Sequence, residues 1–155
     1  MITITSRVAD EHDIEFILEG AEQMNAESSW GLSWSRDIGR NYLTWMVDND
    51  TSDILLVERD GVPVGGSFVA ASWEFHLQPL AYVCKFWVVK EHRRGDVSMV
   101  AVKDILKWAR LRNCSHVFTT ATAGLSAAEQ LLFIRLMKSH GFESCGPVMS
   151  TKLGD

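Results

Sequence analysis

A short basic turn between an apolar run and an amphipathic helix holds the residues best suited to chemistry. Residues 90–98 read KEHRRGDVS; they follow the apolar run 80–89 and precede the helical pattern 97–112. The first N–H groups of a helix lack partners within the helix, and the helix dipole favours negative charge there. Arginines add cationic donors, so the segment predicts a pyrophosphate site. The expected binding residues are Arg93, Arg94, Gly95, Asp96, Val97 and Ser98.

Asp96 is unfavourable in such a site, because a carboxylate repels phosphate groups unless it points away or pairs with Arg93 or Arg94. The alternative interpretation is a solvated basic turn that Asp96 caps. The residue types alone leave both interpretations open.

The elements before this turn follow from capping residues and periodicity. The alternation over residues 2–5 predicts a strand. Asp10 is placed to cap a first helix, and Ser33 or Ser35 a second one. The second helix is expected to bury a stripe on one face, formed by Trp34, Ile38, Tyr42, Trp45 and Met46. Asn25 to Gly31 reads as a polar break between the two helices.

A hairpin and a mixed C-terminal part complete the pattern. Residues 53–58 and 62–73 flank Asp60-Gly61, which is typical of a hairpin turn. Gly65-Gly66 inside the returning strand predicts a bulge or a close neighbour. Residues 116–120 read as a short strand, Ser126 opens a capping box for the last helix, and Gly141 ends it. Residues 142–153 suggest two further short strands.

Composition limits the class of protein. The chain has 155 residues, enough for one domain over residues 1–155, with 46% apolar residues and a net charge of −5. The acidic balance argues against a general nucleic-acid binder. No apolar run approaches the roughly 20 residues that span a bilayer, and no signal peptide is visible. Three widely spaced cysteines predict reduced packing residues in a cytoplasmic protein, with no metal-ligand spacing.

The basic turn resembles the cofactor-binding motif of the GNAT acyltransferase superfamily, usually written Arg/Gln-x-x-Gly-x-Gly/Ala. Arg93 takes its first position, while Asp96 and Ser98 stand where the two glycines are usual. The chain is most similar to phage-encoded GNAT-like proteins, where the turn reads Glu-His/Tyr-Arg-Gly-Gly. Further matches in chain order are residues 25–29, 58–61 with 64–65, 107–110, 123–125 and 140–142.

The order of elements by itself gives only a mixed α/β or α+β class. The resemblance implies more: a central, mostly antiparallel sheet flanked by helices, in which the fourth and fifth strands splay apart. It also implies that the pantetheine arm of acetyl-CoA lies in the splay, against the backbone of Trp87, Val88 and Val89. An N–H group near Val88 is then expected to polarise the thioester carbonyl.

The resemblance also suggests where proton transfer takes place. Family members often carry a tyrosine four residues before the Gly-Phe pair, but Met137 stands there, and a thioether donates no proton. Tyr82 is the substitute acid that the sequence offers. The candidate bases are Glu27, Glu74 and His76; the alternative for each is a solvated loop residue or a helix cap.

Two functions follow from the resemblance. The first is an N-acetyltransferase that moves an acetyl group from acetyl-CoA to a primary amine of a small molecule or protein. The alternative is an inactive GNAT fold acting as a phage structural or partner-binding protein, in a homodimer or a virion. Modification of a nucleobase is a third reading, which the acidic charge disfavours. Asp96 and Met137 favour the inactive form, whereas Arg93 and Arg94 favour the enzyme.

Overall fold

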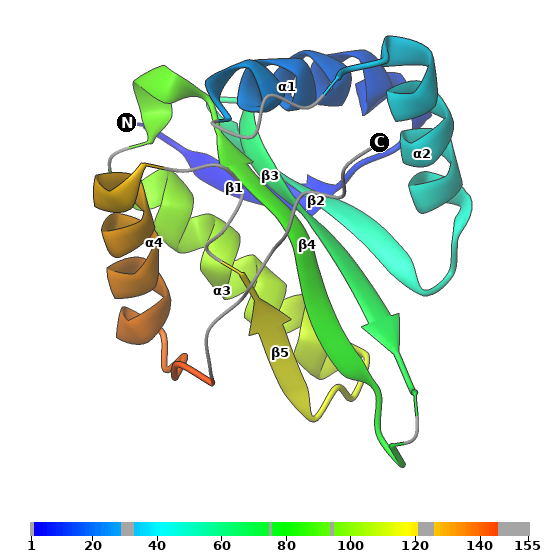
Figure 1. Cartoon of the computed structure of the whole chain (residues 1–155), viewed down its shortest axis with the longest axis vertical. Coiled ribbons are helices and arrows are strands. Elements are labelled where there is room, and N and C mark those ends of the chain that lie inside the picture. The colour runs from blue at the N-terminus through cyan, green and yellow to red at the C-terminus, as the bar shows by residue number, and fades with distance from the viewer. Residues whose placement is uncertain (1, 29–32, 75, 94, 121–125, 146–155) are drawn as a thin grey trace, which may run out of the picture.

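A five-stranded sheet lies between two helical layers in the computed structural model, which describes residues 2–28, 33–74, 76–93, 95–120 and 126–145 (Figure 1). The strands lie in sequence order, antiparallel except for β4 and β5, which are parallel. They are β1 (Ile4–Val8), β2 (Ser52–Arg59), β3 (Val62–Ser72), β4 (Leu80–Val88) and β5 (His116–Thr119). The mixed, mostly antiparallel sheet expected from the resemblance is therefore confirmed.

Helices cover both faces of the sheet. They are α1 (Ile14–Glu27), α2 (Arg36–Asp48), α3 (Asp96–Leu111) and α4 (Ala127–Ser139), with 3-10 turns η1 (Glu11–Asp13) and η2 (Lys90–His92). Helices α1 and α2 pack on one face, around a core with Ile17, Leu56 and Trp87. Helix α3 packs on the other face, through Val97, Ala101, Ile105 and Trp108 among others. Helix α4 lies beside α3 (Figure 1).

The capping predictions are confirmed. Asp10 forms a complete capping box at the 3-10 turn η1, which runs directly into α1, and Ser126 forms one at α4. Ser35 rather than Ser33 caps α2. Gly141 follows α4 with a φ of +88°, as a helix-ending glycine does. Helix α1 runs to Glu27, so it extends into the predicted polar break, and β1 begins and ends later than residues 2–5.

The predicted buried stripe of α2 is wrong for four of its five residues. Ile38 is 71% exposed and Trp45 55%, and Tyr42 and Trp34 are also exposed. Met46 is the one predicted residue that is buried, and Leu43 is buried with it, so the face that the helix turns to the sheet is rotated relative to the aromatic stripe. The cysteine prediction is wrong as well for Cys84 and Cys145, which are exposed.

Some predicted features lie partly or wholly outside the residues that the structure describes. Residues 142–145 form no strand, and residues 146–153 of the expected C-terminal strands lie outside the described residues, as do Arg94 and residues 123–125. Within the described part, no helix combines the length and apolarity that crossing a membrane needs.

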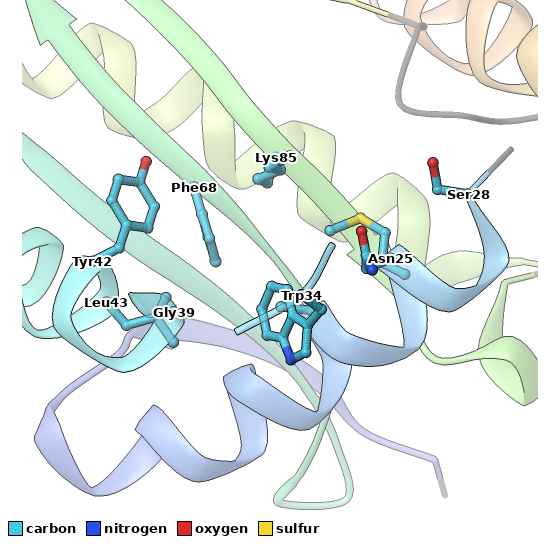
Figure 2. Close-up of a pocket in the computed structure, with 10 residues that line it drawn as sticks. Asn25, Ser28, Trp34, Gly39, Tyr42, Leu43, Phe68 and Lys85 are labelled. Carbon is cyan, nitrogen blue, oxygen red and sulfur yellow. The ribbon is translucent and has the colours of Figure 1, made fainter. Parts of the chain in front are cut away.

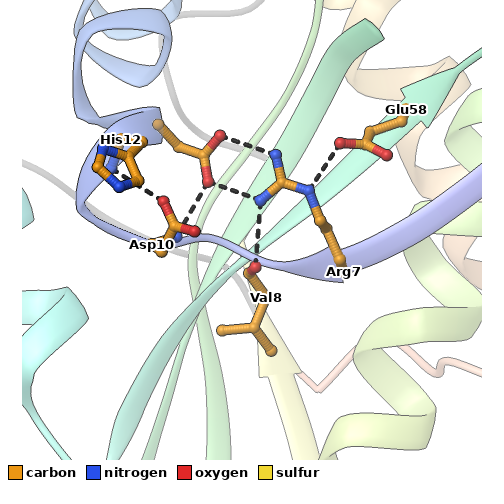
Figure 3. Close-up of polar contacts among 6 residues, drawn as sticks. Arg7, Val8, Asp10, His12 and Glu58 are labelled. Carbon is orange, nitrogen blue, oxygen red and sulfur yellow. Dashed lines mark hydrogen bonds and ion pairs between the residues drawn. The ribbon is translucent and has the colours of Figure 1, made fainter. Parts of the chain in front are cut away.

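An ion-pair cluster fixes the first strand to the start of the helical layer (Figure 3). The Arg7 guanidinium donates to both oxygens of Asp13, over 2.6 and 2.8 Å, and its Nε donates to Glu58 over 2.7 Å. Asp13 is buried, and it also accepts the Asp10 backbone N–H. Because the carboxylate is fully partnered, its burial is tolerated.

Candidate active site

Strand β4 contains a β-bulge at Cys84, where the alternation of side chains between the two faces of the sheet shifts by one residue. Lys85 pairs with Phe68 and Val83 with Val69, so Cys84 is an extra residue without a partner on β3. On the N-terminal side of this bulge Val83 faces α3, and on the C-terminal side Phe86 and Val88 do so. As a result, Lys85 and Trp87 point to the α1–α2 face.

Trp87 sits in a space that glycines leave open. A Cβ atom on Gly66 would lie 2.6 Å from the indole ring, and one on Gly20 of α1 would lie 2.6 Å from Nε1. Phe68 meets the ring edge-on, with centroids 5.3 Å apart. The close neighbour predicted from Gly65-Gly66 is therefore this indole, together with the Trp87 carbonyl, 2.7 Å from a Cβ on Gly65.

The C-terminal half of β4 leaves one backbone edge open. Strand β5 pairs only with Leu80 to Val83, so in the described residues no strand pairs with the far edge of β4 after Val83. The Val89 N–H donates to Val64 on β3, whereas the Val88 carbonyl accepts from the Arg93 side chain. Alternate residues of a strand face alternate edges. The N–H groups of Phe86 and Val88 therefore point to the open edge, and the expected splay is confirmed.

The start of α3 lies directly after this edge and lacks a side-chain cap. Its N-cap residue, Gly95, has a φ of +104° and a ψ of −145°, a conformation that only glycine adopts readily. A Cβ atom there would meet nothing within 4 Å. Unlike the start of α2 or α4, the start of α3 shows no side-chain hydrogen bond to its first N–H groups. Such N–H groups fit a phosphate, and Asp96, Val97 and Ser98 form the first turn.

Arg93 is occupied by protein groups. Its Nε donates to the Val88 carbonyl over 2.9 Å, and its guanidinium pairs with Glu27 at the end of α1. Glu129 of α4 lies 3.9 Å from the same guanidinium. Gln23 donates to the other Glu27 oxygen, so both oxygens of that carboxylate are engaged. Two residues predicted for different roles, phosphate binding and proton acceptance, are thus brought together.

Glu74 and Tyr82 are also brought together. The Tyr82 hydroxyl donates to Glu74 Oε1 over 2.6 Å, which raises the tyrosine pKa. The Tyr82 ring stacks on Phe118 of β5. Glu74 has a φ of +42°, uncommon for a residue other than glycine. His76 is in the loop before β4, where its backbone N–H donates to the Trp73 carbonyl.

Tyr82 shares a groove with Met137. The groove lies between β4, β5 and α4, and its described lining includes Cys84 and Phe133. Tyr82 is six residues before Val88, which is about 18–20 Å along an extended strand. A single thioester carbonyl therefore cannot contact both the Val88 N–H and the Tyr82 hydroxyl, whereas the Phe86 N–H lies nearer to Tyr82.

A separate cavity of about 150 Å³ opens between α1, α2 and the sheet (Figure 2). Trp34, Tyr42 and Phe68 supply aromatic surface, and Lys85 reaches it from β4 just after the bulge. The lining is completed by Ala21, Met24, Asn25, Ser28, Gly39 and Leu43. Sequence reasoning missed this cavity, because it assigned Trp34 and Tyr42 to the core and gave Lys85 no role. The clustering of aromatic residues in α2 was the available signal.

The chain matches a known protein family. The chain matches the model of the Acetyltransferase (GNAT) family over residues 19–142. No curated protein matches it. The aminoglycoside acetyltransferase AAC(6')-Iy, solved with a CoA-based bisubstrate analogue, superposes with a TM-score of 0.78 at 13% identity over 99% of both chains.

Two further solved acetyltransferase structures superpose on this chain over nearly its whole length. AAC(6')-IG from Acinetobacter haemolyticus gives a TM-score of 0.73 at 15% identity, over 97% of this chain and 99% of that one. A putative acetyltransferase from Agrobacterium tumefaciens gives 0.74 at 16%, over 96% and 99%. Identities this low show a shared fold alone. The comparisons give no support to the narrower resemblance to phage-encoded members.

Proposed function

The chain belongs to the GNAT acetyltransferase family, and on that premise we propose that it is an N-acyltransferase that uses acetyl-CoA and a primary amine. In this reaction the amine nitrogen bonds to the acyl carbon as the carbon–sulfur bond of the thioester breaks; the amine loses a proton and the thiolate gains one. The observation that carries the proposal is the open edge of β4 leading to the uncapped start of α3.

The cofactor-binding roles divide between backbone and side chain. The first N–H groups of α3, from Gly95 to Ser98, would bind the pyrophosphate. The Phe86 and Val88 N–H groups would bind the pantetheine amides and polarise the thioester carbonyl, with Phe86 closer to the proton donor. Trp87 and Val89 act by fixing the strand, since the indole is buried and the Val89 N–H is bonded to β3.

In this proposal Arg93 and Glu27 hold the turn after β4 in position. Their ion pair joins the end of α1 to the turn after β4, and the bond to the Val88 carbonyl fixes the open edge. Because Glu27 holds Arg93 with one oxygen and Gln23 with the other, we assign it a positioning role.

Tyr82 is the proposed proton donor to the leaving thiolate. Its one proton is donated to Glu74 in this structure, so the hydroxyl must turn from Glu74 to the thiolate sulfur to donate it. His76 is the proposed base, because it belongs to the same loop as Glu74 and makes no side-chain hydrogen bond within the described residues. No finding supports the inactive alternative, although Met137 stands where family members often carry the tyrosine that Tyr82 would replace.

The binding half of the proposal is tested with Gly95→Ala. In the native protein, CoA at about 100 times its Kd should stabilise the fold by roughly 2.7 kcal/mol. Gly95→Ala should reduce this stabilisation, because alanine disfavours the backbone conformation that presents the N–H groups. Gly61→Ala is the matched control: Gly61 has a φ of +80° and equally open surroundings, but it lies in the β2–β3 turn.

The catalytic half is tested by release of free CoA in the presence of amines. Tyr82→Phe should lower kcat with little change in KM for acetyl-CoA. A native protein that shows neither a CoA-dependent shift nor CoA release with any amine would contradict the proposal.

A further inference from the structure

The cavity between α1 and α2 has the size and surface for one aromatic ring. A cavity of about 150 Å³ holds a molecule the size of benzene. Rings from both layers line it: Trp34 and Tyr42 from the α2 region, and Phe68 from β3 (Figure 2). Aromatic pairs gain stability from edge-on and offset contacts, so these rings favour an aromatic ligand.

One charge lines this cavity in the described part of the chain, and it is positive. Lys85 makes no ion pair or hydrogen bond with any described residue. The bulge at Cys84 is what turns Lys85 to this face. An unpaired ammonium beside an apolar surface favours an anionic ligand group.

Acidic groups near the cavity do not offset Lys85. Glu22 pairs with Arg36, and Glu27 pairs with Arg93. Residues 29–32, which lie outside the description, read SWGL in the sequence and so include no carboxylate. A polycationic acceptor such as an aminoglycoside would meet a lysine here and find no free carboxylate among the described lining residues.

We infer that the acceptor is an aromatic amine that also carries a carboxylate, with its ring in this cavity and its carboxylate on Lys85. A single ammonium suits one carboxylate, whereas phosphate recognition more often uses arginine forks or helix N-termini. This inference rests on the proposed function, because it names the acceptor of the same transfer reaction.

The test uses phenylalanine and phenethylamine, which share a ring and an amine and differ only in the carboxylate. Binding of each is measured by calorimetry without acyl donor, and release of CoA is then measured with acetyl-CoA present. The native protein should bind phenylalanine about fivefold more tightly than phenethylamine, the value of one partly exposed ion pair.

Four variants assign that preference to Lys85. Lys85→Met should abolish it without weakening phenethylamine binding, because the lost charge repels the phenethylammonium group, and Lys85→Arg should retain it. Lys103→Met removes the same charge from an exposed site on α3 and should change neither affinity. Trp34→Leu should weaken both ligands alike, because it removes ring contacts and no charge.

The outcomes separate this inference from the proposed function. Transfer to amines with no preference for phenylalanine, or a preference that survives Lys85→Met, would overturn the inference and leave the function standing. A Lys85-dependent preference without CoA release under any condition would support the acceptor site and contradict the transfer reaction.

Discussion

Arg93 and Glu27 neutralise each other across the junction of α1 and the turn after β4. Sequence reasoning assigned the first residue to a phosphate and the second to a proton. The ion pair commits both to holding the open edge of β4, since Arg93 also donates to the Val88 carbonyl. In the proposed function, phosphate binding is therefore assigned to the backbone N–H groups at the start of α3.

Removing the Arg93–Glu27 pair should lower stability even without a ligand. Arg93→Met and Glu27→Gln should show a coupling free energy of about 0.5–1 kcal/mol in a double-mutant cycle, because both side chains are about one-third exposed. Denaturant unfolding measures it. Arg93→Met should cost more than Glu27→Gln, since it also removes the bond to Val88. If the effects of the two changes on the free energy of unfolding are additive, the Arg93–Glu27 ion pair does not contribute to stability.

Both tyrosines of the chain should titrate above the usual value near 10. Partial burial of its ring raises the pKa of Tyr42, and the hydrogen bond to Glu74 raises that of Tyr82. The stability that a raised tyrosine pKa contributes is fully present below the unfolded value and is lost as pH rises through the folded value. Tyrosinate absorbance measures the two titrations.

Glu74→Gln isolates the Tyr82 titration. It should move the pKa of Tyr82 back towards its usual value and leave that of Tyr42 unchanged. Tyr42→Phe and Tyr82→Phe assign the two transitions. A single transition near 10 in the native protein would contradict the Glu74 contact.

The Arg7–Asp13 pair should make the free energy of unfolding depend on pH in the acidic range. The Arg7 hydrogen bonds lower the pKa of Asp13, so its contribution is present above the unfolded value of about 3.9 and is lost as pH falls through the folded value. Asp13→Asn should destabilise the protein at neutral pH by about 2 kcal/mol, less than a fully buried pair because Arg7 is partly exposed.

The matched control for Asp13 is Asp37→Asn, an exposed aspartate that makes no ion pair or hydrogen bond within the described residues. It should change stability at neutral pH and its acid dependence much less than Asp13→Asn does, because the Asp37 charge acts only through the dipole of α2 and the nearby Arg40. Denaturant unfolding between neutral and acidic pH measures both. Equal acid dependence of the native protein and Asp13→Asn would rule out this role of the pair.

Gly20→Ala should be destabilising only while Trp87 is present. The new Cβ would lie 2.6 Å from the indole, and such overpacking costs about 1–3 kcal/mol. In Trp87→Phe the same change should become stabilising, by up to about 1 kcal/mol, because alanine is the better helix former. A double-mutant cycle measures this, and equal effects in both backgrounds would contradict the contact.

Local signals in the sequence predicted most of the fold. Asp10, Ser35 and Ser126 are capping residues whose preference depends on nearby backbone, so their roles could be read from the chain. The exposed aromatic face of α2 could not, because periodicity shows that a stripe exists but not which element covers it. Tertiary packing chose Leu43 and Met46.

The candidate site was predictable only in part. The start of α3 follows from a local strand–turn–helix pattern, and Gly95 was found in this way. The partners of Arg93 come from Glu27 and Glu129, which are far away in sequence, so composition and spacing gave no sign of them. Lys85 acquires its direction from the bulge at Cys84, an irregularity that alternation rules do not anticipate.

The bulge at Cys84 also makes β4 tolerant of a change in length at one position. Val83 and Lys85 face opposite sides of the sheet with one residue between them, and two adjacent residues of a regular strand do the same. Deleting Cys84 would therefore leave Lys85 and Trp87 on the α1–α2 face and Phe86 and Val88 on the α3 face, with their pairing to β3 kept. A one-residue deletion farther along β4, with the bulge kept, would instead turn the residues that follow it to the opposite faces.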